Sequence, residues 1–202
     1  MHVVENTVMM LAMLLPATYL AGSVNFPILL FSMLGRDDPR YHFSGNAGAT
    51  NVYRQAGLWW AGVVLLLDLG RAVVVSGAAL DLLPKQYVPW VGLVLVLGNH
   101  FPCFHQFRGG KGVASYLGFT ALLSPVSAMI SALVWLMAYG IVRIPFIASF
   151  FMMAVLMVGT IIACGYHPSA TAGTIATALF IFYNHEQNIM DLFSSSHSDK
   201  RG

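Results

Sequence analysis

The sequence predicts an all-α integral membrane protein with about seven transmembrane helices, and its composition is the first evidence. Hydrophobic residues make up 57% of the chain and charged residues only 9%, whereas a soluble domain is about a quarter charged. The mean hydropathy is +0.72. The apolar residues gather in long runs, and most basic residues lie between those runs. Such a chain cannot cover its surface with polar groups in water, so we expect it to cross a bilayer several times.

Seven apolar runs are candidate spans, because a helix needs about 20 apolar residues to cross the hydrocarbon core. They are residues 8–34 (interrupted by Ala-Gly-Ser-Val-Asn-Phe-Pro), 58–80, 88–101, 112–123, 126–142, 146–164 and 169–183. The third and fourth are short, which is tolerated where a span lines a polar cavity within the protein. The first seven residues contain Glu5 but no Lys or Arg, unlike a secretory signal, so we expect the first run to be a mature span.

The distribution of Lys and Arg predicts the orientation of the chain. With the N-terminus outside and seven crossings, Arg71 lies within a span and only Lys85 lies outside. The remaining basic residues lie inside, as the positive-inside rule requires: Arg36, Arg40, Arg54, Arg108, Lys111, Arg143, Lys200 and Arg201. The polar segments 36–56, 98–112 and 184–191 then share the inner side and could form one composite site. No repeat or linker divides the chain, so residues 1–202 are predicted to be a single membrane-embedded domain.

The first polar segment contains Ser-Gly-Asn-Ala-Gly-Ala-Thr-Asn-Val-Tyr-Arg, residues 44–54. Gly45 and Gly48 permit conformations that expose backbone N–H groups, and such groups form anion-binding nests. Arg54 adds a planar fork suited to phosphate. Short polar side chains complete the set: Ser44, Asn46, Thr50 and Asn51. An ordinary solvated loop between helices is the alternative interpretation.

The second segment, residues 98–115, has the glycines Gly109, Gly110 and Gly112 around Lys111 and leads into a predicted helix. A glycine turn, a lysine and a helix N-terminus together form a phosphate site. The segment is not a P-loop, because His105 stands where that motif requires glycine. Lys111 as a membrane anchor is the alternative. His105 and Arg108 are interpreted as interfacial anchors, and His100 as either a site residue or a buried, hydrogen-bonded histidine.

Two pairs of polar residues occur at helical spacing. His185 and Asn188 in the third segment would share a helix face, although a helix end fraying into a polar tail is equally compatible with the sequence. Asp68 and Arg71 lie within a span. A charge inside a membrane is costly and usually paired or functional, and we favour a structural ion pair over catalysis.

The sequence lacks the residues that several classes of chemistry require. The histidines at 42, 100, 105 and 185 are not followed by Asp at the fifth position, and no Gly-x-Ser-x-Gly elbow occurs. No carboxylate cluster predicts a metal, and no cofactor is expected. Cys103 and Cys164 fall on opposite sides in this topology, so both are predicted to be free thiols. A net charge of +2 without a basic run does not indicate nucleic acid.

The polar segments together resemble the bacterial acyl-phosphate:glycerol-3-phosphate acyltransferases of the PlsY type. The resemblance covers nearly the whole chain. Its motifs are Gly-Ser-Val-Asn-Phe (22–26), Asp-Pro-Arg (38–40), the stretches 44–57 and 98–115, and His-Glu-Gln-Asn-Ile (185–189).

The resemblance implies a seven-helix protein of the bacterial inner membrane, with its N-terminus periplasmic, its C-terminus cytoplasmic and its active site facing the cytoplasm. It implies transfer of an acyl chain from acyl phosphate to the 1-hydroxyl of sn-glycerol 3-phosphate, giving lysophosphatidic acid and phosphate, with neither acyl-CoA nor acyl carrier protein as donor. Phosphate is a good leaving group, so positioning and charge stabilisation can suffice. We expect Ser44, Lys111, His185 and Asn188 to be catalytic. We expect the substrates to be bound by Asn46, Thr50, Asn51, Arg54, His100, Gly109 and Gly110.

The chain departs from the pattern of the family it resembles at several positions. Phe43 replaces a glycine, and Arg71 replaces a lysine. Around Arg143, residues 144–149 keep only Ser149 of a Tyr-x-Ser-x-x-Ser pattern, with Phe146 among the changes. Glu186 and Asp191 replace arginines, which makes that edge acidic. A paralogue with altered activity is therefore one alternative. A transporter of a phosphorylated solute and a purely structural membrane subunit are the others.

Overall fold

A computed structural model describes residues 2–198, and every regular element in that range is helical. The elements are α1 (His2–Ser23), α2 (Phe26–Met33), η1 (Pro39–Tyr41), α3 (Ala49–Ala56), α4 (Leu58–Leu82), η2 (Lys85–Tyr87), α5 (Val88–His100), α6 (Val113–Leu123), α7 (Pro125–Val142), α8 (Pro145–Ala163), α9 (Pro168–Tyr183) and α10 (Glu186–Ser198). The all-helical prediction is confirmed. Lys200 and Arg201, predicted to lie inside, are outside the described residues.

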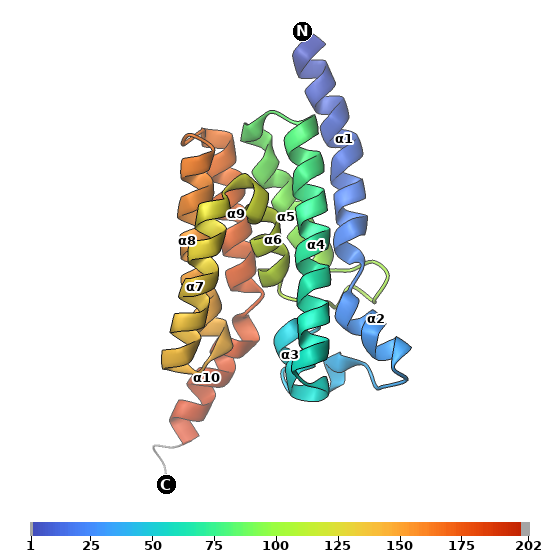
Figure 1. Cartoon of the computed structure of the whole chain (residues 1–202), viewed down its shortest axis with the longest axis vertical. Coiled ribbons are helices and arrows are strands. Elements are labelled where there is room, and N and C mark those ends of the chain that lie inside the picture. The colour runs from blue at the N-terminus through green and yellow to red at the C-terminus, as the bar shows by residue number, and fades with distance from the viewer. Residues whose placement is uncertain (1, 199–202) are drawn as a thin grey trace.

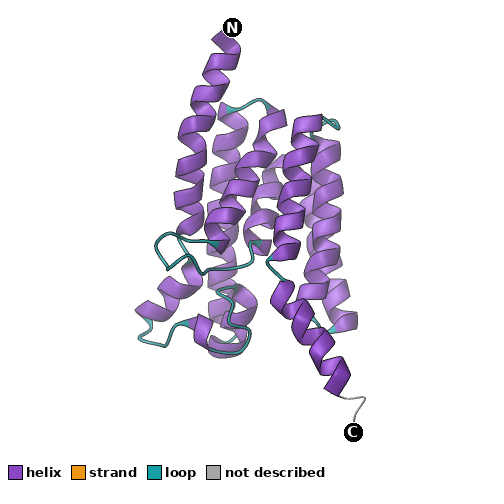
Figure 2. Cartoon of the chain, turned by 180° about the vertical axis from the view of Figure 1, so that it is seen from behind, coloured by secondary structure: helices purple, strands orange, loops and turns teal. Residues whose placement is uncertain are grey.

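The helices α1 and α4 to α9 run side by side as one bundle (Figure 1). The N-terminus lies at one end of the bundle and the C-terminus at the other, while α2, α3 and α10 lie at the C-terminal end (Figures 1 and 2). Helix α5 is central, since it contacts α1, α4, α6 and α9. Each of the seven predicted apolar runs corresponds to a helix of this bundle, and the first run also includes α2.

Proline sets the start of three helices one residue earlier than predicted. Pro125, Pro145 and Pro168 begin α7, α8 and α9. The first helical position tolerates proline, because the backbone N–H of that position has no partner within the helix. A proline that bounded an apolar run in the sequence is therefore part of the helix.

Among residues 2–198, four stretches are long and apolar enough to span a membrane: Glu5–Met33, which holds α1 and α2, and the helices α4, α7 and α8. Helices α6 and α9 are apolar but shorter. Large apolar side chains remain exposed along α7, including Met129, Leu133, Met137 and Ile141. Such a face is compatible with lipid and not with water. The count of seven crossings and the side on which each terminus lies stay predictions.

Two buried clusters hold the bundle together. Val75, Val91, Leu95 and Phe119 pack between α4, α5 and α6. Tyr116, Met153, Leu156 and Ile181 pack between α6, α8 and α9. Both clusters include residues of α5 or α6, the helices on either side of the second polar segment. That segment therefore begins and ends on rigid elements.

The predicted Asp68–Arg71 ion pair is confirmed, with 2.9 Å between Asp68 Oδ1 and Arg71 Nη2 and both side chains 8% exposed. Arg71 also donates hydrogen bonds to the carbonyl oxygens of Gly22 and Val24, where α1 ends. The helix breaks there because Asn25 caps α2, its Oδ1 accepting the Ile28 N–H at 3.3 Å. The ion pair thus satisfies backbone groups that the break leaves free.

The short helix α3 was not predicted, and α10 decides between the two alternatives for the third polar segment. Residues 49–56 were interpreted as part of a glycine-rich loop, but they form α3, in which Val52 is fully buried against Phe31 and α4. The chain also does not fray after α9. It turns at Asn184 and His185 and continues as α10. Both Cys103 and Cys164 are free, as predicted.

Candidate active site

The second polar segment folds back on the helix that precedes it. The backbone N–H of Gly109 donates to the His100 carbonyl at 3.0 Å, and that of Gly110 donates to the Asn99 carbonyl at 2.9 Å. The His100 ring returns a bond, because its Nδ1 lies 2.9 Å from the Gly110 carbonyl oxygen. A carbonyl only accepts, so Nδ1 carries the proton. His100 is thus a hydrogen-bonded histidine that shapes the glycine turn.

Glycine is required at three positions of this turn. A Cβ at Gly109 would clash with the Asn99 carbonyl oxygen and the Pro102 ring. A Cβ at Gly110 would lie 2.7 Å from the Ala47 carbonyl oxygen and 2.7 Å from Asn99 Nδ2, too close for any side chain. Gly112 has φ +83°, in the left-handed region, and immediately precedes α6. The contact with Ala47 brings the first polar segment against the second. The first turn of α6 has no side-chain cap, so its backbone N–H groups remain available.

Lys111 connects the second segment to the third. Its Nζ donates to Asn188 Oδ1 on α10, and the Asn184 amide donates to the Lys111 carbonyl at 3.3 Å. The side chain is half-buried. Burial lowers the pKa of the Lys111 amine to about 8, and the carboxylate of Asp191 opposes that shift. A half-buried amine at the start of a helix can attract a phosphate group.

His185 is 3% exposed, and its Nδ1 lies 2.8 Å from the Ile181 carbonyl oxygen. The proton therefore sits on Nδ1 and leaves Nε2 as an acceptor. Burial lowers the pKa of His185 to about 4; the bond to Ile181 opposes the shift, whereas the charges of Lys111 and His100 add to it. The imidazole is neutral at pH 7. It packs edge-to-face on Phe150, with 5.3 Å between ring centroids.

The first segment presents its polar groups in two ways. Ser44, Thr50 and Arg54 are exposed, and Asn46 is half-buried. Asn51 is buried and faces inward, and its Nδ2 donates to the carbonyls of Pro39, His42 and Asn46 at 2.8, 3.2 and 3.0 Å. These bonds occupy the amide hydrogens of Asn51, and its remaining oxygen would repel phosphate. We therefore expect Asn51 to shape the loop instead of contacting substrate.

The predicted site residues thus fall into two groups. The structure brings His100, Gly109, Gly110, Lys111, His185 and Asn188 together where α5, α6, α9 and α10 meet. Ser44, Asn46, Thr50 and Arg54 lie on the adjacent first segment, which touches this group at Ala47 and Gly110.

Three residues that support the site were not predicted as part of it. Asn184 holds the Lys111 backbone. Asn99 accepts the Gly110 N–H with its carbonyl, and its Oδ1 lies 3.2 Å from Arg71 Nη2. Ser115, on α6, accepts from Arg71 at 2.8 Å. These groups are asparagines and a serine beside the motifs, but nothing in their spacing distinguishes them from ordinary loop and helix residues.

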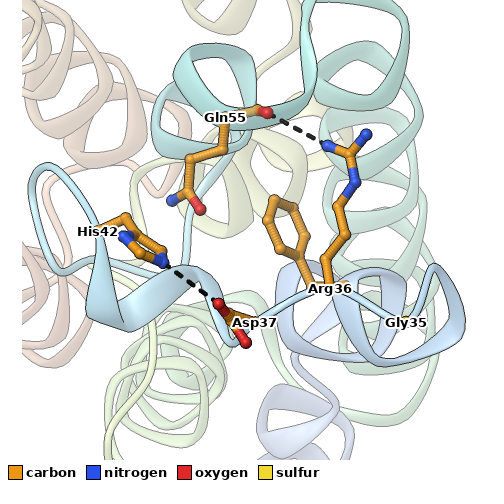
Figure 3. A pocket seen from close by; sticks show the side chains of 6 residues that line it. Gly35, Arg36, Asp37, His42 and Gln55 are labelled. Atoms are coloured by element: carbon orange, nitrogen blue, oxygen red, sulfur yellow. Dashed lines mark hydrogen bonds and ion pairs between the residues drawn. The ribbon is translucent and has the colours of Figure 1, made fainter.

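A separate hollow of about 330 Å³ lies beside the first segment (Figure 3). It is lined by Phe31, Gly35, Arg36, Asp37, His42 and Gln55. Arg36 donates to the Gln55 carbonyl at 3.2 Å, and His42 Nε2 lies 3.8 Å from Asp37 Oδ2 (Figure 3). None of the predicted site residues lines this hollow, so the phosphate-site prediction gains nothing from it.

Metal-binding groups were searched for in the described part of the chain. There, no three side chains of His, Cys, Asp or Glu are grouped so that they could hold a metal ion. The donors around Lys111 are instead an amine, amides and backbone N–H groups, which suit an anion. Metal independence stays a prediction.

The comparisons with known proteins agree with this geometry. The family model described as glycerol-3-phosphate acyltransferase matches residues 12–195. A glycerol-3-phosphate acyltransferase of Pseudomonas fluorescens is 38% identical over 177 residues, covering 87% of this chain and 92% of that protein. One from Neisseria meningitidis is 35% identical over 198 residues, covering 90% and 92%.

Two solved structures have the same fold. Both are of PlsY, an integral membrane glycerol 3-phosphate acyltransferase. The glycerol 3-phosphate form has a TM-score of 0.84 and 32% identity, covering 91% of this chain and 92% of its own. The lysophosphatidic acid form has a TM-score of 0.82 and 31% identity, with the same coverage. The family match spans most of the chain, and the predicted resemblance is confirmed. This chain therefore belongs to the glycerol-3-phosphate acyltransferase family.

Proposed function

We propose that this chain transfers an acyl group from acyl phosphate to the 1-hydroxyl of sn-glycerol 3-phosphate, giving lysophosphatidic acid and inorganic phosphate. The relatives are named for glycerol 3-phosphate, and one solved relative is a glycerol 3-phosphate form. The position of Lys111 supports the proposal most directly: the residue lies between a glycine turn and the start of α6, and its amine donates to a neutral amide, that of Asn188 on α10.

The two phosphate-bearing substrates require two anion sites. Lys111 and the N–H groups at the start of α6 are the first. The exposed donors of the first segment, Ser44, Thr50 and Arg54, are the second. The contact between Ala47 and Gly110 puts the two sites next to each other. Holding both substrates side by side converts a bimolecular reaction into an effectively unimolecular one.

The chemical step then needs little from the protein. The hydroxyl oxygen of glycerol 3-phosphate attacks the carbonyl carbon of acyl phosphate, and the carbon–oxygen bond to phosphate breaks. The hydroxyl proton passes to the departing phosphate. His185 is too weak a base to take it fully, since its pKa is about 4, but its free Nε2 can accept a hydrogen bond from the hydroxyl and orient it. Lys111 stabilises the charge on phosphate.

The same proposal includes the membrane arrangement. We place the chain as one domain over residues 1–202 in the bacterial inner membrane, with seven crossings, a periplasmic N-terminus and the site facing the cytoplasm. The bundle supports this, because its N- and C-termini lie at opposite ends and α10 lies at the C-terminal end (Figure 1). The α4–α5 connection, which contains Lys85, and the end of α7, which Arg143 caps, lie at opposite ends of the bundle (Figure 1), as this proposed topology requires.

The test is a direct assay of purified protein in lipid nanodiscs, with palmitoyl phosphate and labelled glycerol 3-phosphate. We expect labelled lysophosphatidic acid and release of one phosphate per product. Palmitoyl-CoA should not replace palmitoyl phosphate. If palmitoyl-CoA alone supports the reaction, the donor is wrong. If neither donor gives product in folded protein, the acyltransferase proposal fails, and uptake of labelled glycerol 3-phosphate into proteoliposomes would then test the transporter alternative.

A further inference from the structure

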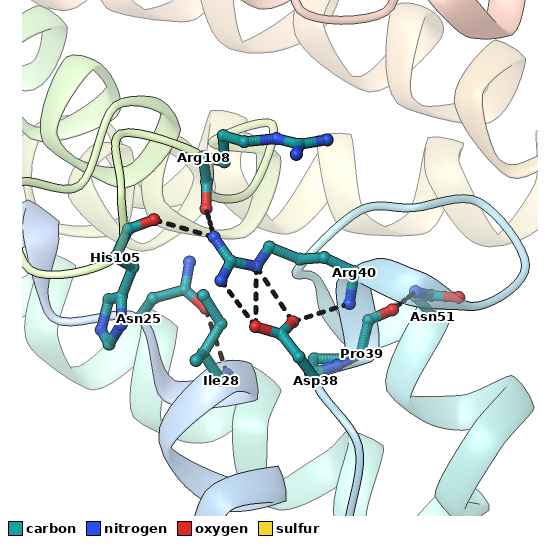
Figure 4. A network of polar contacts seen from close by, with 8 residues as sticks. All are labelled: Asn25, Ile28, Asp38, Pro39, Arg40, Asn51, His105 and Arg108. Carbon is teal, nitrogen blue, oxygen red and sulfur yellow. Dashed lines mark hydrogen bonds and ion pairs between the residues drawn. The ribbon is translucent and has the colours of Figure 1, made fainter.

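Arg40 lies outside the predicted site, yet its side chain makes more polar contacts than any residue of the first segment that was predicted to bind substrate. Its Nε donates to Oδ1 and Oδ2 of Asp38 at 2.9 and 3.0 Å, and its Nη2 donates to Oδ2 at 2.6 Å. Its Nη1 donates to two carbonyl oxygens of the second segment, those of His105 at 2.8 Å and Arg108 at 2.7 Å (Figure 4). Only 10% of the Arg40 side chain is exposed.

The turn that carries Arg40 is fixed to α3 by hydrogen bonds. Asp38 caps η1, and its Oδ1 accepts the Arg40 backbone N–H at 2.9 Å. The Pro39 carbonyl accepts from the Asn51 amide at 2.8 Å and from the Gln55 amide at 3.0 Å. Arg40 therefore projects from a turn that two side chains of α3 hold in place, and Figure 4 shows one of them, Asn51. It forms a bridge from the first polar segment to the second.

The loop that Arg40 holds has turn hydrogen bonds of its own, since the Pro102 carbonyl accepts the N–H groups of His105 and Phe107. It also contains strain, because Gln106 and Phe107 have φ +58° and +55°, in the left-handed region that side chains disfavour. Phe104 and Phe107 are mostly exposed, so their packing stabilises the loop little. The loop leads directly into the site, because the Arg108 carbonyl immediately precedes Gly109. Two charge-assisted bonds from Arg40 fix the loop where it enters the glycine turn.

We propose that Arg40 is a positioning residue for the transfer reaction. It sets the distance between the first segment and the Lys111 turn, so that the two anion sites face each other before substrate arrives. We expect it not to contact substrate, because Asp38 and the two carbonyls use four of its five guanidinium hydrogens and only 10% of the side chain is exposed. The predicted effect of Arg40 on the rate of acyl transfer rests on the proposed function, whereas its predicted effect on the position of the loop does not.

The first experiment measures the loop without any need for activity. Cys103 lies in the loop and is half-buried, with its backbone N–H donating to Ser23 Oγ at 3.3 Å. In a Cys164→Ser background, the rate at which a maleimide modifies Cys103 reports how often the loop opens. Arg40→Ala should raise that rate at least about threefold, since it removes two charge-assisted bonds. Arg36→Ala is the matched control: Arg36 also bonds a backbone carbonyl of the first segment, but nothing in the loop.

A second variant covers the case in which Arg40→Ala does not fold. If Arg40→Ala does not give a monodisperse protein, Arg40→Lys replaces it, because lysine keeps the charge but cannot form hydrogen bonds to Asp38 and to both carbonyls at once. A Cys103 rate within about twofold of wild type in a folded Arg40 variant would overturn the proposal. Lys111→Ala should leave the Cys103 rate unchanged, which separates the loop from the phosphate contact.

The second experiment is kinetic. Arg40→Ala should reduce kcat/KM for glycerol 3-phosphate at least about tenfold. In the Lys111→Ala background the same change should cost less than about twofold, because both variants lose the same phosphate contact. Additive losses would show an independent structural effect and refute positioning. The two proposals can fail separately. If the wild-type protein transfers no acyl group, the proposed function is refuted; if Arg40→Ala nevertheless speeds the labelling of Cys103, Arg40 is still the residue that positions the loop.

Discussion

The amine of Lys111 donates a hydrogen bond to Oδ1 of Asn188, 77 residues further along the chain. The partner is a neutral amide, and Asp191, whose carboxylate acts on the pKa of the amine, is exposed. An amine tied to a carboxylate would have to give up an ion pair to bind phosphate. One tied to an amide exchanges a weaker bond for a stronger one, so Asn188 can hold Lys111 in place and release it to substrate.

Replacing Lys111 with alanine should reduce kcat/KM about tenfold to a hundredfold, because a charge-assisted hydrogen bond contributes about 1.5–3 kcal/mol. Lys111→Arg should recover only part of the loss, since a planar fork differs in geometry from a point charge. The measurement is steady-state kinetics of lysophosphatidic acid formation in purified, folded protein.

Lys85 is the matched control for this prediction. It is exposed at the α4–α5 connection, at the other end of the bundle. Lys85→Ala should leave kcat/KM within about twofold of wild type, as surface substitutions usually do. Equal effects of Lys85→Ala and Lys111→Ala would show that Lys111 is only an anchor of the membrane topology.

The orientation in the membrane can be tested by labelling single cysteines in a background without Cys103 and Cys164. The residues Lys85 and Arg54 are both exposed, so access depends on the side of the membrane. A membrane-impermeant maleimide added outside intact cells should modify Lys85→Cys and not Arg54→Cys. After lysis both should react. Modification of Arg54→Cys in intact cells contradicts the predicted topology.

Activity should not require a metal ion, because the donors grouped around Lys111 suit an anion. Incubation with excess EDTA, followed by removal of the chelator, should leave the rate of acyl transfer unchanged. Added Mg²⁺ should change it by less than about twofold, through weak screening of substrate charge alone. A complete loss that only a divalent cation restores would contradict the prediction.

The sequence predicted the parts of this protein that leave a periodic or local pattern. Six of the seven apolar runs match a bundle helix within two residues at each end, whereas the first, residues 8–34, begins six residues after the start of α1 and also includes α2. The spacing of Asp68 and Arg71 predicted their ion pair. Helix α3 was missed because eight residues after a glycine-rich turn are too short for a clear helical period.

The long-range contacts could not be predicted from sequence in the same way. Arg40 bonds carbonyl groups 65 and 68 residues away, and a carbonyl acceptor is present on every residue. The inward orientation of Asn51 depends on the fold of the loop around it. A tertiary contact between a side chain and a backbone group has no characteristic spacing, so only the three-dimensional structure identifies it.

His185 should remain neutral throughout the pH range in which the enzyme works. Its pKa is about 4, mainly because it is buried, and its Nδ1 proton is held by the Ile181 carbonyl. Nitrogen NMR of histidine-labelled protein should include a neutral, Nδ1-protonated signal for His185 that does not titrate from about pH 5.5 to 8. His185→Ala should remove that signal and identify it. If the resonance that this variant removes titrates near pH 6.5 in wild type, His185 is not the neutral histidine described here.

The phosphate affinity of the free enzyme should fall as the pH rises through about 8, the pKa of Lys111. Burial is the main cause of this lowered value. The charged amine, which binds phosphate, dominates below pH 8, and the neutral amine dominates above it. The second ionisation of a phosphate monoester lies near pH 6, so a titration above about pH 7 reports the enzyme and not the substrate.

The profile of kcat/KM against pH measures this ionisation, because kcat/KM reports the free enzyme. We expect kcat/KM to decline with a midpoint near pH 8, from its highest level near pH 7 toward the level of Lys111→Ala. Lys111→Arg should flatten the profile, since arginine stays protonated throughout. Asp191→Asn should move the midpoint to lower pH, because it removes the charge that opposes the shift. A Lys111→Arg profile that declines with the same midpoint as wild type would assign the ionisation to another group.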